Sequence, residues 1–162
     1  MSMIGHYLRL PEAELNRFLL QPASLSELLL SRLSQPSGDC FDIEKAWHII
    51  HFLLTGERSN GPEPLVNAVL GGTPIGEELS YGPARYLTPA QVAALAAALG
   101  PISPEELLGR FDLQAVKNAR IYPSGWILND LVRDFVIHHF QRLKEFFETA
   151  AGQKEAVILY IS

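Results

Sequence analysis

A run of apolar residues near the C-terminal end, 155–162 (EAVILYIS), narrows the choice of fold more than any other segment. Its continuous and partly β-branched character is typical of a strand that is buried in the protein interior. Residues 3–10 (MIGHYLRL) alternate loosely between apolar and polar side chains and stop at Pro11, which predicts a strand at the other end of the chain. We expect the two terminal strands to lie in one small sheet.

Helix start signals recur along the chain between these strands. Thr88 before Pro89, Ser103 before Pro104, and Asp112 each stand where a helix N-cap is expected. A cap side chain accepts a hydrogen bond from a backbone N–H that the first helical turn leaves unpaired. We therefore predict three helices that begin at these positions.

Four further segments are predicted from other patterns. Ser24 and Glu27 have the spacing of a capping box and predict a helix near 25–33. A long amphipathic helix is expected over 127–150, with Leu131 among the residues of its apolar side. Two segments with several Pro and Gly residues are predicted to be irregular: 34–41, and 73–89 apart from a short strand near 79–81 or 84–87.

Helices and strands do not alternate along the chain, which argues against a doubly wound parallel sheet. We predict an α+β fold that is predominantly helical, with a small sheet that includes the N- and C-terminal strands. A length of 162 residues is ordinary for one domain, and we expect a single domain over 1–162.

Composition limits the partners and the compartment. The 13 Lys and Arg against 18 Asp and Glu give a net charge of −5, and no basic run is present to neutralise nucleic-acid phosphates, although a fold could still bring separated basic residues together. Cys40 is the only cysteine, which suits a reducing compartment. The first 15 residues lack the pattern of a signal peptide, and no stretch approaches the length of a membrane span. We expect a cytoplasmic protein that binds neither nucleic acid nor membrane.

The segment 42–57 (DIEKAWHIIHFLLTGE) predicts a helix that begins at Asp42 and ends before Gly56. Most of its positions form a wide apolar arc, so the helix is expected to be central to the fold. Glu44, His48, His51 and Thr55 are spaced so that they would form one narrow polar wedge.

The two histidines of this wedge allow two interpretations. Zinc requires three or four ligands, and His48 and His51 could supply two of them. However, the spacing H-I-I-H differs from the H-E-x-x-H pattern of zinc proteases. We favour the interpretation that both are boundary histidines bonded to neighbouring groups, with a metal or acid–base site as the alternative.

The segment 79–89 (LSYGPARYLTP) brings Tyr81, Arg85 and Tyr86 close to a Gly-Pro turn. Arginine binds carboxylate and phosphate groups in a two-pronged geometry, and the phenol rings could flank a ligand. The alternative is that Arg85 pairs with an acidic residue and stabilises the loop. The nearby glycines lack the spacing of a nucleotide-binding loop.

The sequence contains no complete catalytic constellation, and no cofactor or metal is predicted from it. Whether the protein is an enzyme is left open. Our first hypothesis is a non-catalytic binding or protein-interaction domain, for example an immunity-type or regulatory protein with a protein partner. The alternative is a small-molecule-binding protein or enzyme whose cleft lies between the face of Glu44, His48 and His51 and the loop Tyr81–Tyr86. The oligomeric state is not predicted.

Four segments together resemble the YfbM-like family, a bacterial family of unknown function: DIEKAWHIIHFLLTG, YGPARYLTP, IYP followed by W, and VILYI. The resemblance covers nearly the whole chain. It implies a single-domain fold in the bacterial cytoplasm, and it implies no activity, cofactor or catalytic residue. The residues that carry it are Trp47, His51, Gly56, Tyr81, Gly82 and Arg85.

Overall fold

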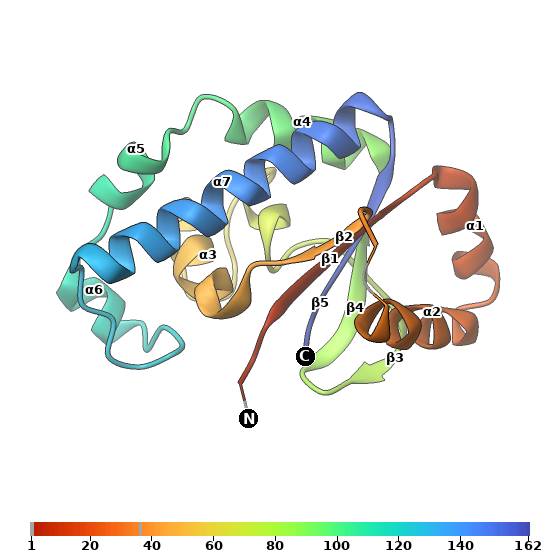
Figure 1. The fold of residues 1–162 in the computed structure, drawn as a ribbon, viewed down its shortest axis with the longest axis horizontal. Coiled ribbons are helices and arrows are strands. Elements are labelled where there is room, and N and C mark those ends of the chain that lie inside the picture. The colour runs from red at the N-terminus through yellow and green to blue at the C-terminus, as the bar shows by residue number, and fades with distance from the viewer. Residues whose placement is uncertain (1, 36) are drawn as a thin grey trace.

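The computed structural model describes residues 2–35 and 37–162. Within them, one antiparallel sheet has the strand order β2-β1-β5-β4-β3. The strands are β1 (Gly5–Leu10), β2 (Cys40–Asp42), β3 (Thr73–Leu79), β4 (Gly82–Leu87) and β5 (Ala156–Ile161). β5 lies in the middle of the sheet and all of its residues are buried, so the strand predicted at the C-terminal end is confirmed. It pairs with β1, so the two terminal strands are neighbours (Figure 1).

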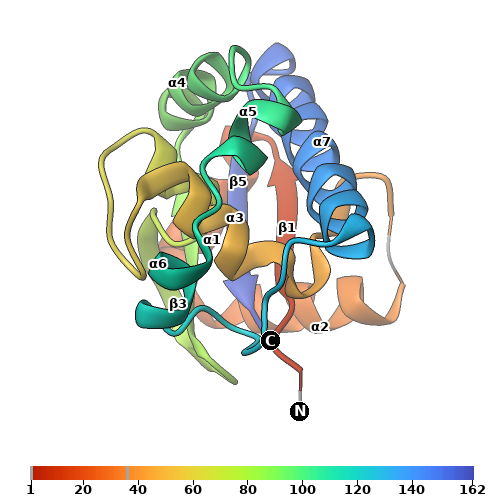
Figure 2. The same ribbon diagram turned by 90° about the vertical axis from the view of Figure 1, so that its left-hand side faces the viewer.

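Helices cover both faces of the sheet. One face carries α1 (Glu12–Leu20) and α2 (Ala23–Ser34). The other carries α3 (Trp47–Thr55), α4 (Pro89–Leu99) and α7 (Asp130–Gly152). In Figure 2, α4 lies to the left of β5 and β1, and α7 lies to their right. The short helices are η1 (Glu44–Ala46), η2 (Leu65–Ala68), α5 (Pro104–Gly109) and α6 (Leu113–Asn118). The predicted α+β class, predominantly helical with a sheet that contains both terminal strands, is confirmed.

Strand alternation divides the buried residues into two cores. Successive side chains of a strand point to opposite faces of the sheet. Leu159 of β5 therefore packs in the core of α3, α4 and α7, whereas its neighbour Ile158 packs in the core of α1 and α2. Because both faces of β5 are covered, its sequence is a continuous apolar run instead of an alternating one.

Gly5 allows α3 to approach the sheet. A Cβ atom at this position would lie 3.0 Å from Cβ of Trp47 and 3.1 Å from Cγ1 of Ile43. Any larger residue would therefore push the start of α3 away from β1. This contact fixes Trp47, and with it the neighbouring His48, relative to the sheet.

The predicted caps of three helices are confirmed. The side chains of Thr88, Ser103 and Asp112 accept hydrogen bonds from the first turns of α4, α5 and α6. Gln91 completes a capping box with Thr88. These caps could be predicted because they depend only on groups within three residues of one another.

The predicted capping box at Ser24 is wrong. The helix α2 begins at Ala23 after Pro22, no side chain caps it, and the Ser24 hydroxyl donates a hydrogen bond to the carbonyl of Gln21 instead. The same spacing can thus serve a turn as well as a cap, because serine hydroxyls bond readily to nearby backbone groups.

Other local predictions are corrected by long-range pairing. Cys40–Asp42, expected to be loop and helix start, pairs with β1 as an edge strand, and the α-helix begins only at Trp47. The segment 73–89 is a hairpin of two full strands, β3 and β4.

The long helix begins at Asp130, capped by Asn129, and Leu131 in its first turn is 82% exposed instead of facing the core. No helix within the described residues is long and apolar enough to cross a membrane.

Candidate ligand-binding site

A cavity of about 550 Å³ opens at one end of the sheet, on the side that carries α3. This volume lies within the range of roughly 300–1,000 Å³ that is usual for small-molecule sites. Three of the six candidate ligand-binding residues from the sequence contribute to its wall: His48, Tyr81 and Arg85. The helix predicted from 42–57 and the loop predicted from 79–89 therefore meet in space.

The secondary structure explains why these three residues meet. His48 lies in the first turn of α3, and Tyr81 lies in the turn between β3 and β4. Arg85 lies on β4 directly opposite Leu159 of β5, so its side chain is on the same face of the sheet as Leu159 and α3.

The remaining residues of the predicted cleft lie elsewhere. Glu44 is exposed in the short helix η1, ahead of α3, and does not line the cavity. His51 is 0% exposed and does not line the cavity. Tyr86 packs in the core of α1 and α2, because it follows Arg85 in a strand and points to the opposite face. The polar wedge predicted on the helix therefore contributes only His48 to the cavity.

Both ring nitrogens of His48 are engaged by backbone groups. The backbone N–H of Tyr122 donates to Nδ1 at 2.9 Å, and Nε2 lies 3.0 Å from the carbonyl oxygen of Arg58. Because a backbone N–H can only donate, Nδ1 is unprotonated and Nε2 carries the hydrogen that bonds to Arg58. Burial lowers the pKa of His48 below its ordinary value, and the charge of Arg58 acts in the same direction. This histidine is neutral, and it joins α3 to two loops.

His51 is buried and neutral as well. Burial lowers its pKa to about 4, and the charge of Arg85 acts in the same direction. Its Nδ1 atom has no hydrogen-bond partner, and its Nε2 atom lies 3.4 Å from the hydroxyl oxygen of Thr55. Arg85 and α3, which carries His51, lie on the same face of the sheet.

An aromatic wall lines the cavity next to His48. The Trp47 ring is stacked on His48 with a centroid separation of 4.5 Å, and Tyr122 lies 5.9 Å from Trp47. Met3 connects Trp47 and Tyr122, because its carbonyl accepts a hydrogen bond from Trp47 Nε1 and its N–H donates to the Tyr122 hydroxyl. These bonds hold the rings of Trp47 and Tyr122 in position.

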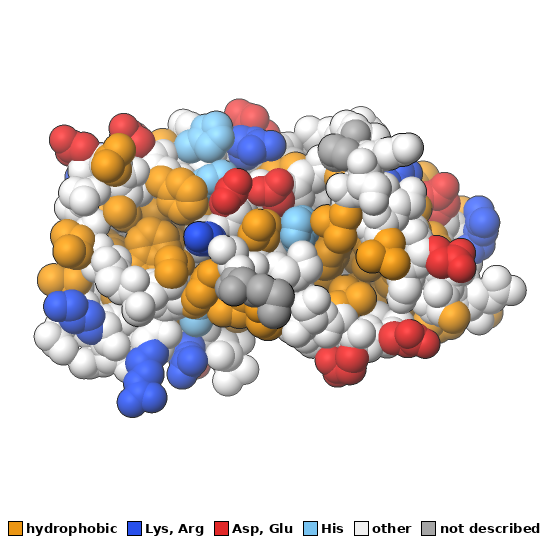
Figure 3. Space-filling view, turned by 60° about the horizontal axis from the view of Figure 1, so that its bottom comes forward, with side chains coloured by type: hydrophobic (Ala, Val, Ile, Leu, Met, Phe, Trp, Pro, Cys, Tyr) orange, Lys and Arg blue, Asp and Glu red, His pale blue; other side chains and the backbone are white. Residues whose placement is uncertain are grey.

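The charged side chains of the cavity wall are all basic. Arg58, Arg85 and Arg120 line it, and no Asp or Glu of the described residues does. An adjoining groove of about 630 Å³ shares Arg58 and Arg120, adds Lys117, and also lacks acidic residues. Figure 3 shows Lys and Arg side chains gathered along the lower left of one face of the molecule, whereas most carboxylates lie on its right-hand half and upper edge. A chain with net charge −5 thus has a locally positive cavity.

Sequence reasoning missed several residues of this cavity, among them Arg58, Arg120 and Tyr122. Arg58 and Arg120 are separated by more than sixty positions and belong to no motif, so no spacing in the sequence connects them. Tyr122 belongs to one of the segments that carry the family resemblance, and that was the only signal for it.

A comparison with protein families shows to which family the chain belongs. The family described as "Domain of unknown function (DUF1877)" matches residues 1–160. The chain belongs to the DUF1877 family.

Among solved structures, the crystal structure of a protein of unknown function, YfbM from Escherichia coli, is similar to this DUF1877 chain over nearly its whole length. The TM-score is 0.74 at 21% identity, and the similarity covers 98% of this chain and 99% of the other. The predicted membership of a YfbM-like family is confirmed. At this identity the likeness extends to the fold alone. Comparison with curated proteins gives no match.

The described part of the DUF1877 chain contains no group of three His, Cys, Asp or Glu side chains arranged to hold a metal ion. His48 and His51 therefore gain no third ligand from those residues. The thiol of Cys40 is not activated as a nucleophile, because burial and the neighbouring Asp39 raise its pKa. The candidate site of this family member is thus a basic and aromatic cavity.

Proposed function

We propose that this DUF1877 protein is a non-catalytic binding domain for a small molecule, which occupies the cavity beside His48, Tyr81 and Arg85. The observation that carries the proposal is the cavity itself: its volume is suitable for a small organic molecule, and its wall combines aromatic rings with a few polar groups. The hydrogen bonds among Met3, Trp47 and Tyr122 support a preformed site.

We propose a non-catalytic domain because both ring nitrogens of His48 already have hydrogen-bond partners. A general base needs a nitrogen that is free to take a proton from the substrate. Nδ1 of His48 already accepts the Tyr122 N–H, and Nε2 already donates to Arg58. The histidine that lines the cavity is therefore occupied in holding the wall together.

A neutral fluorescent dye, N-phenyl-1-naphthylamine, tests this proposal. We expect saturable binding with increased dye fluorescence, and loss of that binding in Ser59→Trp, because Ser59 is an exposed part of the cavity wall and the larger ring would fill the entrance. Ser31→Trp, an exposed position on α2, is the matched control and should bind normally. Absence of saturable binding, or equal binding by the two variants, would overturn the proposal.

A second candidate is a protein-interaction domain, favoured by exposed leucines on the layer of α1 and α2. Leu20 is 84% exposed and Leu30 is 65% exposed. A contiguous apolar patch on the surface marks a site where another protein binds, and these leucines are the candidates for such a patch. Sedimentation equilibrium tests a second copy of the chain as the partner. A mass that rises with concentration in the wild type and stays monomeric in Leu20→Ser/Leu30→Ser would favour this candidate, and a monomeric wild type would remove it.

A further inference from the structure

We infer that the ligand of this cavity is a small organic anion, with an apolar or aromatic body and a carboxylate, phosphate or sulfonate group that Arg85 recognises. The inference rests on the proposed function and names the chemical class of the ligand. Its starting point is the sign of the charge in the cavity. Three arginines and no carboxylate line the wall, although acidic residues outnumber basic ones by 18 to 13 in the chain.

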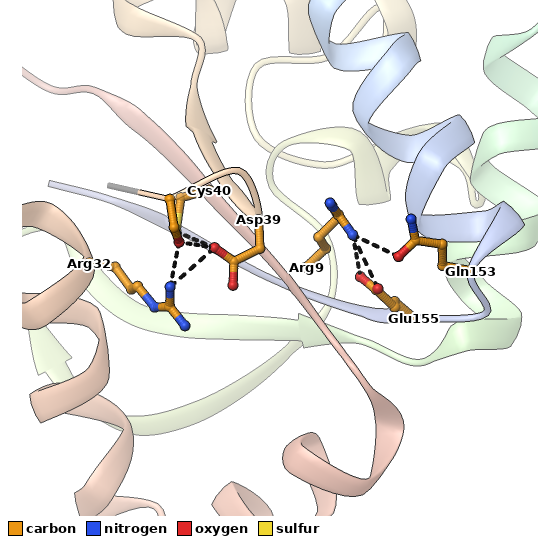
Figure 4. Close-up of polar contacts among 7 residues, drawn as sticks. Arg9, Arg32, Asp39, Cys40, Gln153 and Glu155 are labelled. Atoms are coloured by element: carbon orange, nitrogen blue, oxygen red, sulfur yellow. Dashed lines mark hydrogen bonds and ion pairs between the residues drawn. The ribbon is translucent and has the colours of Figure 1, made fainter. Parts of the chain in front are cut away.

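Arg85 differs from the arginines that have structural partners. Arg9 pairs with Glu155 at 3.1 Å and Arg32 pairs with Asp39 at 3.2 Å, both shown in Figure 4. Arg110 lies 4.0 Å from Glu106. In contrast, the hydrogen bond of the Arg85 side chain within the described residues runs from Nη1 to the carbonyl of Gly71, at 2.8 Å. No carboxylate of the described chain forms a salt bridge with it.

The other N–H groups of Arg85 remain available to a ligand. A guanidinium has five N–H donors, and a single carbonyl uses few of them. Within the described residues, the fully buried side-chain atoms without a hydrogen-bond partner are Nδ1 of His51 and Nδ1 of His139. No nitrogen of Arg85 is therefore both fully buried and unpaired. The free nitrogens of Arg85 are therefore accessible from the cavity that this residue lines. A mostly buried charge without a counter-ion is costly, and an anionic ligand would remove that cost.

The backbone holds Arg85 in position before any ligand binds. It lies on β4, between Pro74 of β3 and Leu159 of β5, and its side chain is anchored to Gly71. A guanidinium fixed in this way loses little conformational freedom on binding an anion, which favours two-pronged contact with a carboxylate or phosphate.

The rest of the wall suits an apolar body. Trp47 and Tyr122 supply aromatic surface, and Leu70, Pro83 and Ile161 supply aliphatic surface. Arg58 and Arg120 are exposed at the same cavity, so they would add attraction for the anionic group without needing direct contact. A free inorganic anion would leave this apolar surface uncovered, which is why we infer an organic anion.

Competition against the bound neutral dye tests the inference with a matched pair of ligands, 2-naphthoate and its uncharged isostere 2-naphthamide. We expect 2-naphthoate to displace the dye at a concentration about tenfold lower than 2-naphthamide, since one two-pronged charged contact contributes about this factor or more. Equal displacement by the two would overturn the inference and leave the proposed function intact. Failure of the dye to bind at all would overturn both.

Arg85→Met, which keeps the length of the side chain and removes its charge, assigns the effect to Arg85. The variant should lose the advantage of 2-naphthoate over 2-naphthamide, with both displacements measured against the variant's own dye affinity, whereas Arg17→Met on the exposed surface of α1 should retain it. A retained advantage in Arg85→Met would overturn the role of Arg85. If circular dichroism shows that this variant is unfolded, Arg58→Met/Arg120→Met replaces it, because both residues are exposed and should leave the fold intact. We expect a loss of about threefold or more in 2-naphthoate affinity from that double variant, and an unchanged affinity would contradict the inference.

Discussion

The backbone N–H of Tyr122 donates a hydrogen bond of 2.9 Å to Nδ1 of His48, although the two residues are 74 positions apart in the sequence. Together with the contact from Nε2 to the Arg58 carbonyl, this bond joins α3 to the loop that follows it and to the connector before α7. The cavity wall therefore depends on one neutral imidazole.

Replacement of this imidazole should destabilise the protein. In His48→Leu, the N–H of Tyr122 and the carbonyl of Arg58 lose their partner, and unpaired buried groups of this kind cost about 2–3 kcal/mol in total. Urea denaturation should show this loss in the free energy of unfolding. The control is His138→Leu, an exposed histidine of α7, with an expected change below about 0.5 kcal/mol. Equal effects of the two substitutions would contradict the structural role of His48.

Stability should fall as the pH falls from neutral toward 5, because His51 is buried in its neutral form. Its pKa is about 4 in the folded protein against 6.5 as the ordinary value. As the pH falls, the unfolded chain therefore binds a proton before the folded protein does. The loss of stability begins as the pH approaches the ordinary pKa of 6.5 and is complete near the folded pKa of about 4. Linkage predicts a loss of about 2 kcal/mol from this group between about pH 7.5 and about pH 5.

The measurement is urea denaturation at both pH values. His51→Gln should show a pH dependence smaller by about 2 kcal/mol than the wild type, since glutamine does not titrate. His48 and His139 also have pKa values lowered by burial, so part of the dependence should remain in the variant. An identical pH dependence in both proteins would show that His51 is accessible to protons in the folded state.

Gly5→Ala should destabilise the packing of α3 against β1. The added methyl group would lie 3.0 Å from Cβ of Trp47, too close for an ordinary contact. Overpacking of this kind costs about 1–3 kcal/mol. Gly109→Ala in α5 is the matched control, because an added Cβ there meets no atom within 4 Å, and alanine favours a helix by up to about 1 kcal/mol. Melting midpoints should move in opposite directions, and a stable Gly5→Ala variant would disprove the close approach.

The capping box of α4 offers a test of local structure. Thr88→Ala removes the side chain that accepts the N–H of Gln91 and should cost about 1 kcal/mol. Ser24→Ala at the wrongly predicted box of α2 should cost less than about 0.5 kcal/mol, because that hydroxyl caps no helix. Denaturation curves of the two variants provide the comparison. A larger loss for Ser24→Ala would reverse our assignment of the caps.

Local signals in the sequence predicted much of the fold. The caps at Thr88, Ser103 and Asp112 and the continuous apolar run of β5 were all predicted correctly, because each depends on neighbours in the chain or on complete burial. Sequence reasoning failed at β2 and in the hairpin of β3 and β4. Cys40–Asp42 becomes a strand only because β1 lies beside it, and β1 is more than thirty residues away in the chain.

The candidate site was predicted only in part, because it also combines local signals with contacts between distant segments of the chain. The sequence by itself determined that His48 belongs to a central apolar helix and that Tyr81 and Arg85 flank a Gly-Pro turn. Only the tertiary structure decided that Arg85 points toward α3 while Tyr86 points away, since strand pairing sets which face each residue occupies. It also decided that Arg58 and Arg120 join Arg85 at one cavity. Electrostatic effects depend on distance in space, and the spacing of residues along a chain carries no record of that distance.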